Sequence, residues 1–463
     1  MIPRKIPVQK AWGPTLLVDK HLRRATQSDL GAPKAGDGTG NPPNMFKNNY
    51  RWIICGLLLL GTTKNYVDRQ ILGVLKVTLQ SNFGWSEIDY SNLILVFQGS
   101  YAIGMLAVGR LIDRLGTRAG YALAMFFWSV ASMAHAACGS LAGFALARGA
   151  LGFWEAGVFP ASTKCVSEWF PAKERALANG IFNAGTNFGA MLTPVFVPWV
   201  VLHLGWRWAF LIVGSLGFVW LFLWLENYRK PQVHPNCTPE ELAYIQDGLP
   251  EAFERIPWRV LLGVRQTWTI IAAKFLVDPI WWFYLFWIPD FLHRRFGLNL
   301  SQIGLPIVMI YVISDVGSVA GGWSSSRMMK AGWSANTSRK LTMLLCALLA
   351  IPVMGAYRVN GFWVATSIIA LAAAAHCGFS ANLYTLASDL FPSRTVGSVI
   401  GLGGFAAGLG GMLIAKIVGH VLQSTGSYMA PFFIAGMAYL TALLVIQVLS
   451  PKLKPVSTFS STN

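Results

Sequence analysis

Apolar runs long enough to cross a lipid bilayer fill most of this 463-residue chain. A membrane-spanning helix needs about 20 predominantly apolar residues, because the hydrocarbon core is about 30 Å thick and a helix rises about 1.5 Å per residue. Runs of this kind lie at about 51–75, 90–111, 119–138, 142–165, 177–201, 207–227, 266–291, 302–323, 341–357, 362–386, 396–421 and 428–449. The sequence therefore predicts an all-α membrane protein with twelve transmembrane helices.

Composition excludes several other classes of protein. Hydrophobic residues make up 54% of the chain and charged residues only 12%, whereas roughly a quarter of the residues in soluble proteins are charged. The six cysteines form no CxxC pair and show no zinc spacing. P-loop, HExxH and GxSxG motifs do not occur in the sequence. We expect neither an enzyme nor a disulfide scaffold, and no metal or organic cofactor.

The formal net charge of +17 could indicate a nucleic-acid partner, but the charge does not form one basic face. With the N-terminus placed inside, about 26 of the 37 Lys and Arg residues fall in inner segments and about 5 in outer loops. This asymmetry is the one that the positive-inside rule describes. The sequence predicts that both termini are cytoplasmic, that the partner is the lipid bilayer, and that no nucleic acid binds.

The longest polar interval between spans, 228–265, divides them six and six. We expect an N-terminal six-helix half at 49–227, a cytoplasmic central loop, and a C-terminal six-helix half at 266–449. A polar leader at 1–48 is predicted to be a disordered cytoplasmic arm, and 450–463 a short cytoplasmic tail.

The two predicted halves share sequence. The run Ser167-Glu168-Trp169-Phe170-Pro171 after span four returns as Ser388-Asp389-Leu390-Phe391-Pro392 after span ten. Two halves repeated in the same orientation are typical of transporters that bind their substrate between the halves, near the middle of the membrane. The spacing Gly185-x-x-x-Gly189 further predicts a surface for close helix packing.

The loop after span two reads Gly109-Arg110-Leu111-Ile112-Asp113-Arg114-Leu115-Gly116-Thr117-Arg118. It resembles the G-x-L-x-D-R-x-G-x-R signature of the major facilitator superfamily. Its glycines permit close approach of helices, and its aspartate can pair with arginines and latch a cytoplasmic gate. We assign the gate motif to Gly109, Asp113, Arg114, Gly116 and Arg118.

A wider resemblance covers nearly the whole chain from about residue 50. It rests on Asn65-Tyr66-Val67-Asp68-Arg69-Gln70, Arg148 through Gly157, Asn183 through Asn187, Lys274 through Tyr284, and Gly378 through Leu383. These runs resemble the anion:cation symporter family, and within it the bacterial hexuronate transporters. The resemblance implies a multi-pass protein of the bacterial inner membrane that imports glucuronate or galacturonate with protons by alternating access, with the proton gradient as driving force. We expect a monomer.

Two other functions remain open from the sequence. The same fold could carry another organic anion, such as galactonate, tartrate, an aromatic acid or an organic phosphate. A non-transporting sensor or a channel-like anion conductor would be a different class, and counterflow distinguishes a carrier from a channel.

Ionisable residues inside spans are costly and are functional candidates. At about 1.5 Å per residue, Arg69 on span one and Arg148 on span four reach about the same depth. Two guanidinium groups at one depth could bind a carboxylate, because each presents a planar fork of donors. The competing interpretation is that they only neutralise Asp68 and Glu155.

Glu155 and Asp68 are the candidate proton-coupling residues. Burial raises the cost of ionising a carboxylate, so a buried acid can carry a proton unless a nearby arginine keeps it ionised. Competition between the substrate carboxylate and one of these acids for the same arginine would couple proton to anion.

A sugar acid also needs hydroxyl partners and flat faces. The candidates for this contact are Tyr66, Tyr101, Thr186, Asn187, Tyr284, Asn382 and Tyr384. For Tyr101 the assignment comes from the resemblance to sugar-acid carriers. For each of these residues the alternative is an ordinary hydrogen bond between helices.

Overall fold

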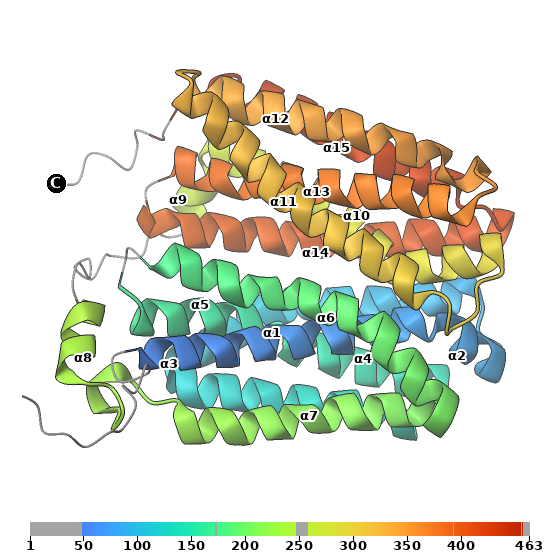
Figure 1. The fold of residues 1–463 in the computed structure, drawn as a ribbon, viewed down its shortest axis with the longest axis horizontal. Coiled ribbons are helices and arrows are strands. Elements are labelled where there is room, and N and C mark those ends of the chain that lie inside the picture. Colours follow the sequence, from blue (N-terminus) through green and yellow to red (C-terminus); the bar gives the residue numbers. More distant parts are fainter. Residues whose placement is uncertain (1–48, 172–173, 247–257, 392, 455, 457–463) are drawn as a thin grey trace, which may run out of the picture. The chain divides into compact units, whose positions relative to one another are not determined.

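In the computed structural model the chain divides into two units, Met1–Asn44 and Met45–Asn463. The structure describes residues 49–171, 174–246, 258–391, 393–454 and 456, all in the second unit, and these form helices without any strand (Figure 1). The arm predicted at 1–48 lies outside the described residues, as does most of the predicted tail. The all-helical prediction is confirmed.

The helices follow the predicted apolar runs closely. They are α1 (Tyr50–Val74), α2 (Lys76–Phe83), α3 (Glu87–Ala134), η1 (His135–Ala137), α4 (Leu141–Glu155), α5 (Val158–Trp169), α6 (Arg175–Leu204), α7 (Trp206–Asn227), η2 (Pro231–Val233), α8 (Pro239–Gln246), α9 (Trp258–Leu262), α10 (Arg265–Phe296), α11 (Gly304–Lys330), α12 (Ala335–Ala350), η3 (Ile351–Arg358), α13 (Phe362–Leu390), α14 (Ser393–Thr425) and α15 (Met429–Leu449).

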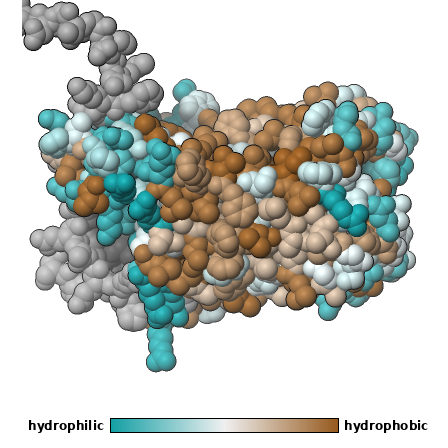
Figure 2. Space-filling view, turned by 90° about the horizontal axis from the view of Figure 1, so that it is seen from below, coloured by the Kyte–Doolittle hydropathy of each residue, from teal (hydrophilic) through white to brown (hydrophobic). Residues whose placement is uncertain are grey.

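Within the described chain, 9 helical segments are long and apolar enough to cross a membrane. Figure 2 shows apolar side chains gathered over the middle of one face, with hydrophilic side chains toward both ends of that face. Large apolar residues such as Leu146, Val219 and Phe222 are exposed. An apolar belt of this kind needs lipid to cover it. The protein is a multi-pass membrane protein.

Helix α3 extends over two predicted spans and the loop that was predicted between them. Its residues are helical on both sides of Gly116, which alone leaves helical geometry, at φ 80° and ψ 164°. A residue with a side chain is strained at this φ, so glycine makes a one-residue break possible. The predicted loop is therefore a sharp corner between two continuous helices.

Glycines set the closest helix contacts. A Cβ atom added to Gly104 of α3 would lie 2.2 Å from the carbonyl oxygen of Phe153 on α4, and one on Gly152 would lie 2.5 Å from the carbonyl of Phe97. On α6, a Cβ on Gly185 would lie 2.5 Å from the Leu59 carbonyl of α1. The packing surface predicted at Gly185 is confirmed.

The segment between α7 and α10 is partly folded against α1. Glu241 of α8 accepts hydrogen bonds from the backbone N–H groups of Tyr50 and Arg51, each at 3.1 Å, and from Arg51 Nη1 at 3.1 Å. A carboxylate is stabilising at a helix N-terminus, where backbone N–H groups lack partners. Glu241 thus caps a helix about 190 positions earlier in the chain.

At the other end of α1, a network of ion pairs joins α2 and α3 to α10. Lys76 Nζ lies 2.7 Å from Glu87 Oε2 and 2.7 Å from Asp290 Oδ2. Arg294 pairs with Glu87 and lies 2.9 Å from Asp290 Oδ2. The Tyr428 hydroxyl also donates to Asp290. We call Lys76, Glu87, Asp290, Arg294 and Tyr428 the end network.

Candidate anion and proton site

Arg69 of α1 is fully enclosed in the helix bundle, with 1% of its surface exposed. Its Nε donates a hydrogen bond of 2.7 Å to Glu155 Oε1, and its Nη2 lies 2.6 Å from the same oxygen. Glu155 is the last residue of α4, so this ion pair ties α4 to α1. A buried charge must be paired, and this pair satisfies both partners in part.

Aromatic rings surround the Arg69 guanidinium. Its central carbon lies 5.1 Å from the ring centroid of Tyr66, 5.4 Å from Phe97, 4.7 Å from Tyr101 and 4.8 Å from Trp282. Cations are attracted to aromatic faces at such distances. Because Trp282 belongs to α10, the rings around Arg69 come from helices far apart in the sequence.

Arg148 of α4 lies next to Arg69 and has no surface exposed. Its Nη2 is 3.4 Å from the backbone carbonyl of Arg69, and its guanidinium is 4.5 Å from the Phe97 centroid. Its Nε and Nη1 have no hydrogen-bond partner among the described residues. A buried charged donor without a partner costs more than the roughly 1–3 kcal/mol of a neutral one. Arg148 is thus a buried cation with two donors that no described residue uses.

The two acids predicted for proton coupling lie in different surroundings. Glu155 uses Oε1 for Arg69, while its Oε2 has no hydrogen-bond partner among the described residues. Both oxygens of Asp68 are occupied: Oδ2 accepts from Trp128 Nε1 at 2.6 Å and lies 2.6 Å from Lys64 Nζ. Ser132 Oγ donates to Oδ1. Of these two acids, Glu155 alone has an oxygen that no described residue contacts by a hydrogen bond.

Among the predicted sugar contacts of the earlier helices, Tyr66 and Tyr101 lie against Arg69. The Thr186 hydroxyl of α6 donates a hydrogen bond of 2.7 Å to the Asn183 carbonyl in its own helix. The side-chain amide of Asn187 donates to Asp315 of α11. The structure therefore brings the two tyrosines to the arginine, while Thr186 and Asn187 have partners within α6 and on α11.

The later candidates are spread over several contacts. Asn382 of α13 is buried and donates to the carbonyls of Gly321 at 3.1 Å and Gly378 at 3.0 Å, which are bonds within and between helices. Tyr384 has 47% of its surface exposed, and its hydroxyl accepts a hydrogen bond of 2.9 Å from Lys274 Nζ. Lys274 also pairs with Asp278 at 2.6 Å.

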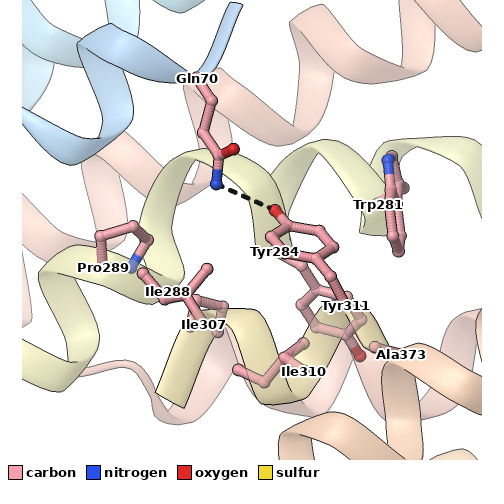
Figure 3. A pocket seen from close by; sticks show the side chains of 9 residues that line it. All are labelled: Gln70, Trp281, Tyr284, Ile288, Pro289, Ile307, Ile310, Tyr311 and Ala373. Carbon is pink, nitrogen blue, oxygen red and sulfur yellow. Dashed lines mark hydrogen bonds between the residues drawn. The ribbon is translucent and has the colours of Figure 1, made fainter. Parts of the chain in front are cut away.

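Tyr284 lines a small cavity of about 10 Å³ with Gln70 and Tyr311 (Figure 3). The side-chain amide of Gln70, the residue after Arg69, donates a hydrogen bond of 3.2 Å to the Tyr311 hydroxyl. This bond links α1 to α11. The cavity has room for about one water molecule, so in this conformation it does not hold a sugar.

The predicted gate motif lies at the corner of α3. Asp113 pairs with Lys164 of α5 at 3.3 Å, Arg118 donates to the Leu225 carbonyl of α7, and Arg114 is exposed. A Cβ on Gly109 would meet Pro160 only at 3.9 Å, an ordinary contact. A closer approach occurs at Gly104 of the same helix, where an added Cβ would lie 2.2 Å from the Phe153 carbonyl oxygen of α4.

Several residues of this site were not assigned a role from the sequence. They are Lys64, Phe97, Trp128 and Ser132, all of which contact Arg69, Arg148 or Asp68. Lys64 carried a usable signal, since it lies four residues before Asp68 on one helix face. The aromatic and hydroxyl partners depend on how α3 packs on α1, which the local sequence does not specify.

The sequence model of the Major Facilitator Superfamily matches residues 58–415. The chain belongs to this superfamily. Its members are transporters, and the prediction that the chain is not an enzyme is confirmed.

Among curated proteins, the chain is 35% identical over 412 residues to the hexuronate transporter of Escherichia coli (strain K12), covering 87% of this chain and 94% of that protein. It is 37% identical over 316 residues to the galacturonate transporter of Dickeya chrysanthemi, covering 66% of this chain and 91% of that protein. The predicted resemblance to hexuronate transporters is confirmed.

The fold is similar to the crystal structure of a D-xylose–proton symporter. The TM-score is 0.70 at 17% identity, covering 88% of this chain and 100% of that chain. This likeness shows the fold of the superfamily and leaves the cargo to be argued from the site.

Proposed function

We propose that this protein is a proton-coupled symporter that imports hexuronates, glucuronate and galacturonate, across a bacterial inner membrane. In this proposal twelve spans form two six-helix halves, 49–227 and 266–449, with both termini in the cytoplasm. The halves rock about a central site, and the end network closes the site toward the outside. The protein works as a monomer without a cofactor.

The observation that carries the proposal is Arg148, a buried guanidinium beside the Arg69–Glu155 ion pair, two of whose nitrogens have no partner among the described residues. A carboxylate fits this arrangement, because it can accept two parallel hydrogen bonds from one guanidinium. The names of the similar proteins in Escherichia coli and Dickeya chrysanthemi support a hexuronate as the substrate that carries this carboxylate.

Coupling follows from competition for Arg69. While Glu155 is ionised, it holds Arg69 through Oε1. When a proton binds Glu155, the pair weakens and Arg69 turns to the substrate carboxylate beside Arg148. When the site opens to the less acidic cytoplasm, Glu155 loses its proton, takes Arg69 back and displaces the anion.

The sugar ring would lie against the aromatic faces around Arg69. We propose Tyr66 and Tyr101 as the nearest ring contacts, since both already line the guanidinium. Tyr384, held by Lys274, is the candidate from the later helices that retains exposed surface. Thr186, Asn187 and Asn382 would have to exchange their present hydrogen bonds to reach the sugar. The buried Tyr284 hydroxyl has no partner among the described residues, but the cavity that Tyr284 lines would have to widen.

The test is uptake into liposomes that contain the purified protein. An inward proton gradient should drive accumulation of radiolabelled glucuronate and galacturonate, and a protonophore should abolish it. Counterflow with galactonate or another acid, but with neither hexuronate, would show that a protein of this fold carries a different organic anion. Transport that saturates with no counterflow for any acid would contradict a carrier.

A further inference from the structure

We propose that Lys274, Asp278 and Tyr384 form a second subsite, which binds the neutral, hydroxyl-bearing end of the substrate and rejects a second carboxylate. We call these three residues the Lys274 cluster. The inference rests on the hexuronate transport proposed above and specifies which sugar acids the carrier accepts. They are acids with one carboxylate rather than two.

Helix α10 connects this cluster to the arginine site. Lys274, Asp278 and Trp282 follow one another at intervals of four residues, so they share one face of the helix. Trp282 lies 4.8 Å from the Arg69 guanidinium carbon. One interval of four residues is about 6 Å along a helix, and a chain of six carbons at about 1.5 Å per bond is long enough to cover it. A sugar acid held at Arg69 by its carboxylate can therefore reach Asp278 with its other end.

Tyr384 of α13 joins the cluster to the rings around Arg69. Its hydroxyl accepts a hydrogen bond of 2.9 Å from Lys274 Nζ, and its ring centroid lies 4.2 Å from the same ammonium. Tyr384 also interacts electrostatically with Tyr66 and Tyr101, two of the rings that line the guanidinium. The cluster therefore belongs to the same interior region as the arginine site.

The charges of the cluster are balanced, and its cation is covered. Lys274 Nζ lies 2.6 Å from Asp278 Oδ2, so the charges of the pair sum to zero. The lysine side chain is only 3% exposed, whereas that of Asp278 is 20% exposed and Tyr384 is 47% exposed. A Cβ on Gly403 of α14 would lie 2.6 Å from Lys274 Cδ, so α14 packs directly against the lysine. A ligand in this region meets the aspartate and the tyrosine, not the ammonium.

The accessible groups suit hydroxyls better than carboxylates. A carboxylate has about four acceptor positions, and Lys274 uses one oxygen of Asp278, so the aspartate can still accept a hydrogen bond from a sugar hydroxyl. The Tyr384 hydroxyl accepts from the lysine, which leaves its own proton to be donated to a sugar oxygen. A second carboxylate on the substrate would face Asp278, and the repulsion between like charges would oppose binding.

The two subsites together determine the direction in which the substrate binds. The arginine site holds two guanidinium groups, of Arg69 and Arg148, against the one carboxylate of Glu155, so it retains a positive charge for an anion. The Lys274 cluster has no such charge to offer. Galacturonate fits both subsites, since it has a carboxylate at one end and a hydroxyl at the other. Galactarate has the same carbon skeleton with a carboxylate at each end, and it fits only the arginine site.

Competition in counterflow tests the inference on the unmodified protein. Liposomes loaded with unlabelled galacturonate take up radiolabelled galacturonate, while external galacturonate or galactarate competes. We expect galactarate to need at least about a tenfold higher concentration for half-maximal inhibition. Equal inhibition by the two acids would overturn the inference. If labelled galacturonate shows no counterflow at all, the proposed hexuronate transport is rejected and this inference with it.

Asp278→Asn tests the origin of this selectivity. Asparagine keeps the size of the side chain but leaves the Lys274 ammonium without its counter-charge, so the subsite gains a positive charge. We expect galactarate to improve as a competitor, relative to galacturonate, by at least about tenfold. Asp389→Asn, which removes the carboxylate of another ion pair, is the matched control and should keep the ratio of the unmodified protein. An Asp278→Asn ratio equal to that of the control would overturn the inference, whatever the absolute rates.

Tyr384→Phe keeps the inference testable if Asp278→Asn does not fold. Phenylalanine retains the ring beside Lys274 and removes only the hydroxyl of an exposed side chain. Because a hydrogen bond to a sugar oxygen is lost, we expect the half-saturating concentration of galacturonate to rise about tenfold, with the maximal counterflow rate unchanged. Tyr357→Phe, whose hydroxyl accepts from Arg358, is the control and should leave both values unchanged. A half-saturating concentration that does not rise in Tyr384→Phe would contradict the subsite.

Discussion

The Arg148 side chain shows how much one buried group can indicate about function. It lies beside Arg69, contacts Phe97, and has two nitrogens without a partner in the described chain. Stability alone would favour an apolar residue there. The chain retains a cation because, in our proposal, the missing partner arrives with each transport cycle.

Arg148→Lys tests the geometry of this cation while keeping its charge. An ammonium cannot present two parallel donors, so we expect the uptake rate at low substrate concentration to fall at least about tenfold, which corresponds to about 1.4 kcal/mol. Initial rates of glucuronate uptake in liposomes measure this. Arg358→Lys, at an exposed position, is the matched control and should transport normally. Equal rates in both variants would contradict a bidentate anion contact.

At the scale of helices, α3 packs more closely on its neighbours at Gly104 than at Gly109, the first glycine of the predicted gate motif. Gly104 lets α3 and α4 approach until a Cβ would lie 2.2 Å from a carbonyl oxygen, while the neighbouring Gly109 has ordinary space. This contact holds α3 against α4, the helix that carries Arg148.

Gly104→Ala should therefore destabilise the protein by about 1–3 kcal/mol, the usual cost of overpacking. The helices would have to separate, because the clashing atom belongs to the backbone. Thermal unfolding in detergent measures the effect. Gly109→Ala, five residues later on the same helix, should unfold at the temperature of the unmodified protein. A similar loss in both variants would contradict the assignment of the contact to Gly104.

The loop after α7 carries a predicted pH response. Burial lowers the pKa of His234, whose Nε2–H donates 2.9 Å to the Asn227 carbonyl while its Nδ1 accepts 3.1 Å from the Asn236 N–H. Because the folded state favours the neutral ring, the stabilisation is complete above the unfolded pKa of about 6.5 and is lost as pH falls below it.

His234→Asn should accordingly flatten the decrease in unfolding temperature between pH 7 and pH 5. His420→Asn, at an exposed histidine, should leave that decrease unchanged. Fluorescence-monitored melting across this pH range compares the three proteins. If the slope of the His234→Asn protein matches that of the unmodified protein, His234 is not the group that responds.

Helix positions could be predicted because apolar runs of about 20 residues have few other structures available in a membrane. The corner at Gly116 and the capping of α1 by Glu241 could not, since the first depends on one φ angle and the second joins residues about 190 positions apart. The depth of Arg69 and Arg148 followed from helix rise alone. Their partners, and the pairing of Lys64 with Asp68, depend on side-chain packing between helices.

At the scale of the whole transporter unit, the end network joins α2 and α3 to α10, with Lys76 buried between Glu87 and Asp290. In the proposed alternating-access cycle these contacts must break when the site opens to the outside. Because these charges are buried, losing any one partner would leave another charge uncompensated and destabilise the closed arrangement.

Asp290→Asn should loosen this end of the bundle, because Lys76 and Arg294 lose a shared carboxylate. We expect faster hydrogen–deuterium exchange in Lys76–Phe83 and in the last turns of α10. Asp389→Asn removes the carboxylate that pairs with Arg339 between α12 and α13 and serves as the control. Exchange that is unchanged at the end network in the Asp290 variant would show that these ion pairs do not hold it closed.

The most direct measurement of proton coupling through the arginine site uses Glu155→Gln in liposomes. Glutamine keeps the size of the side chain but cannot take up a proton, so Arg69 should remain available to the substrate. We predict that this variant exchanges glucuronate in counterflow and does not accumulate it under an inward proton gradient. Accumulation comparable to that of the unmodified protein would contradict the account.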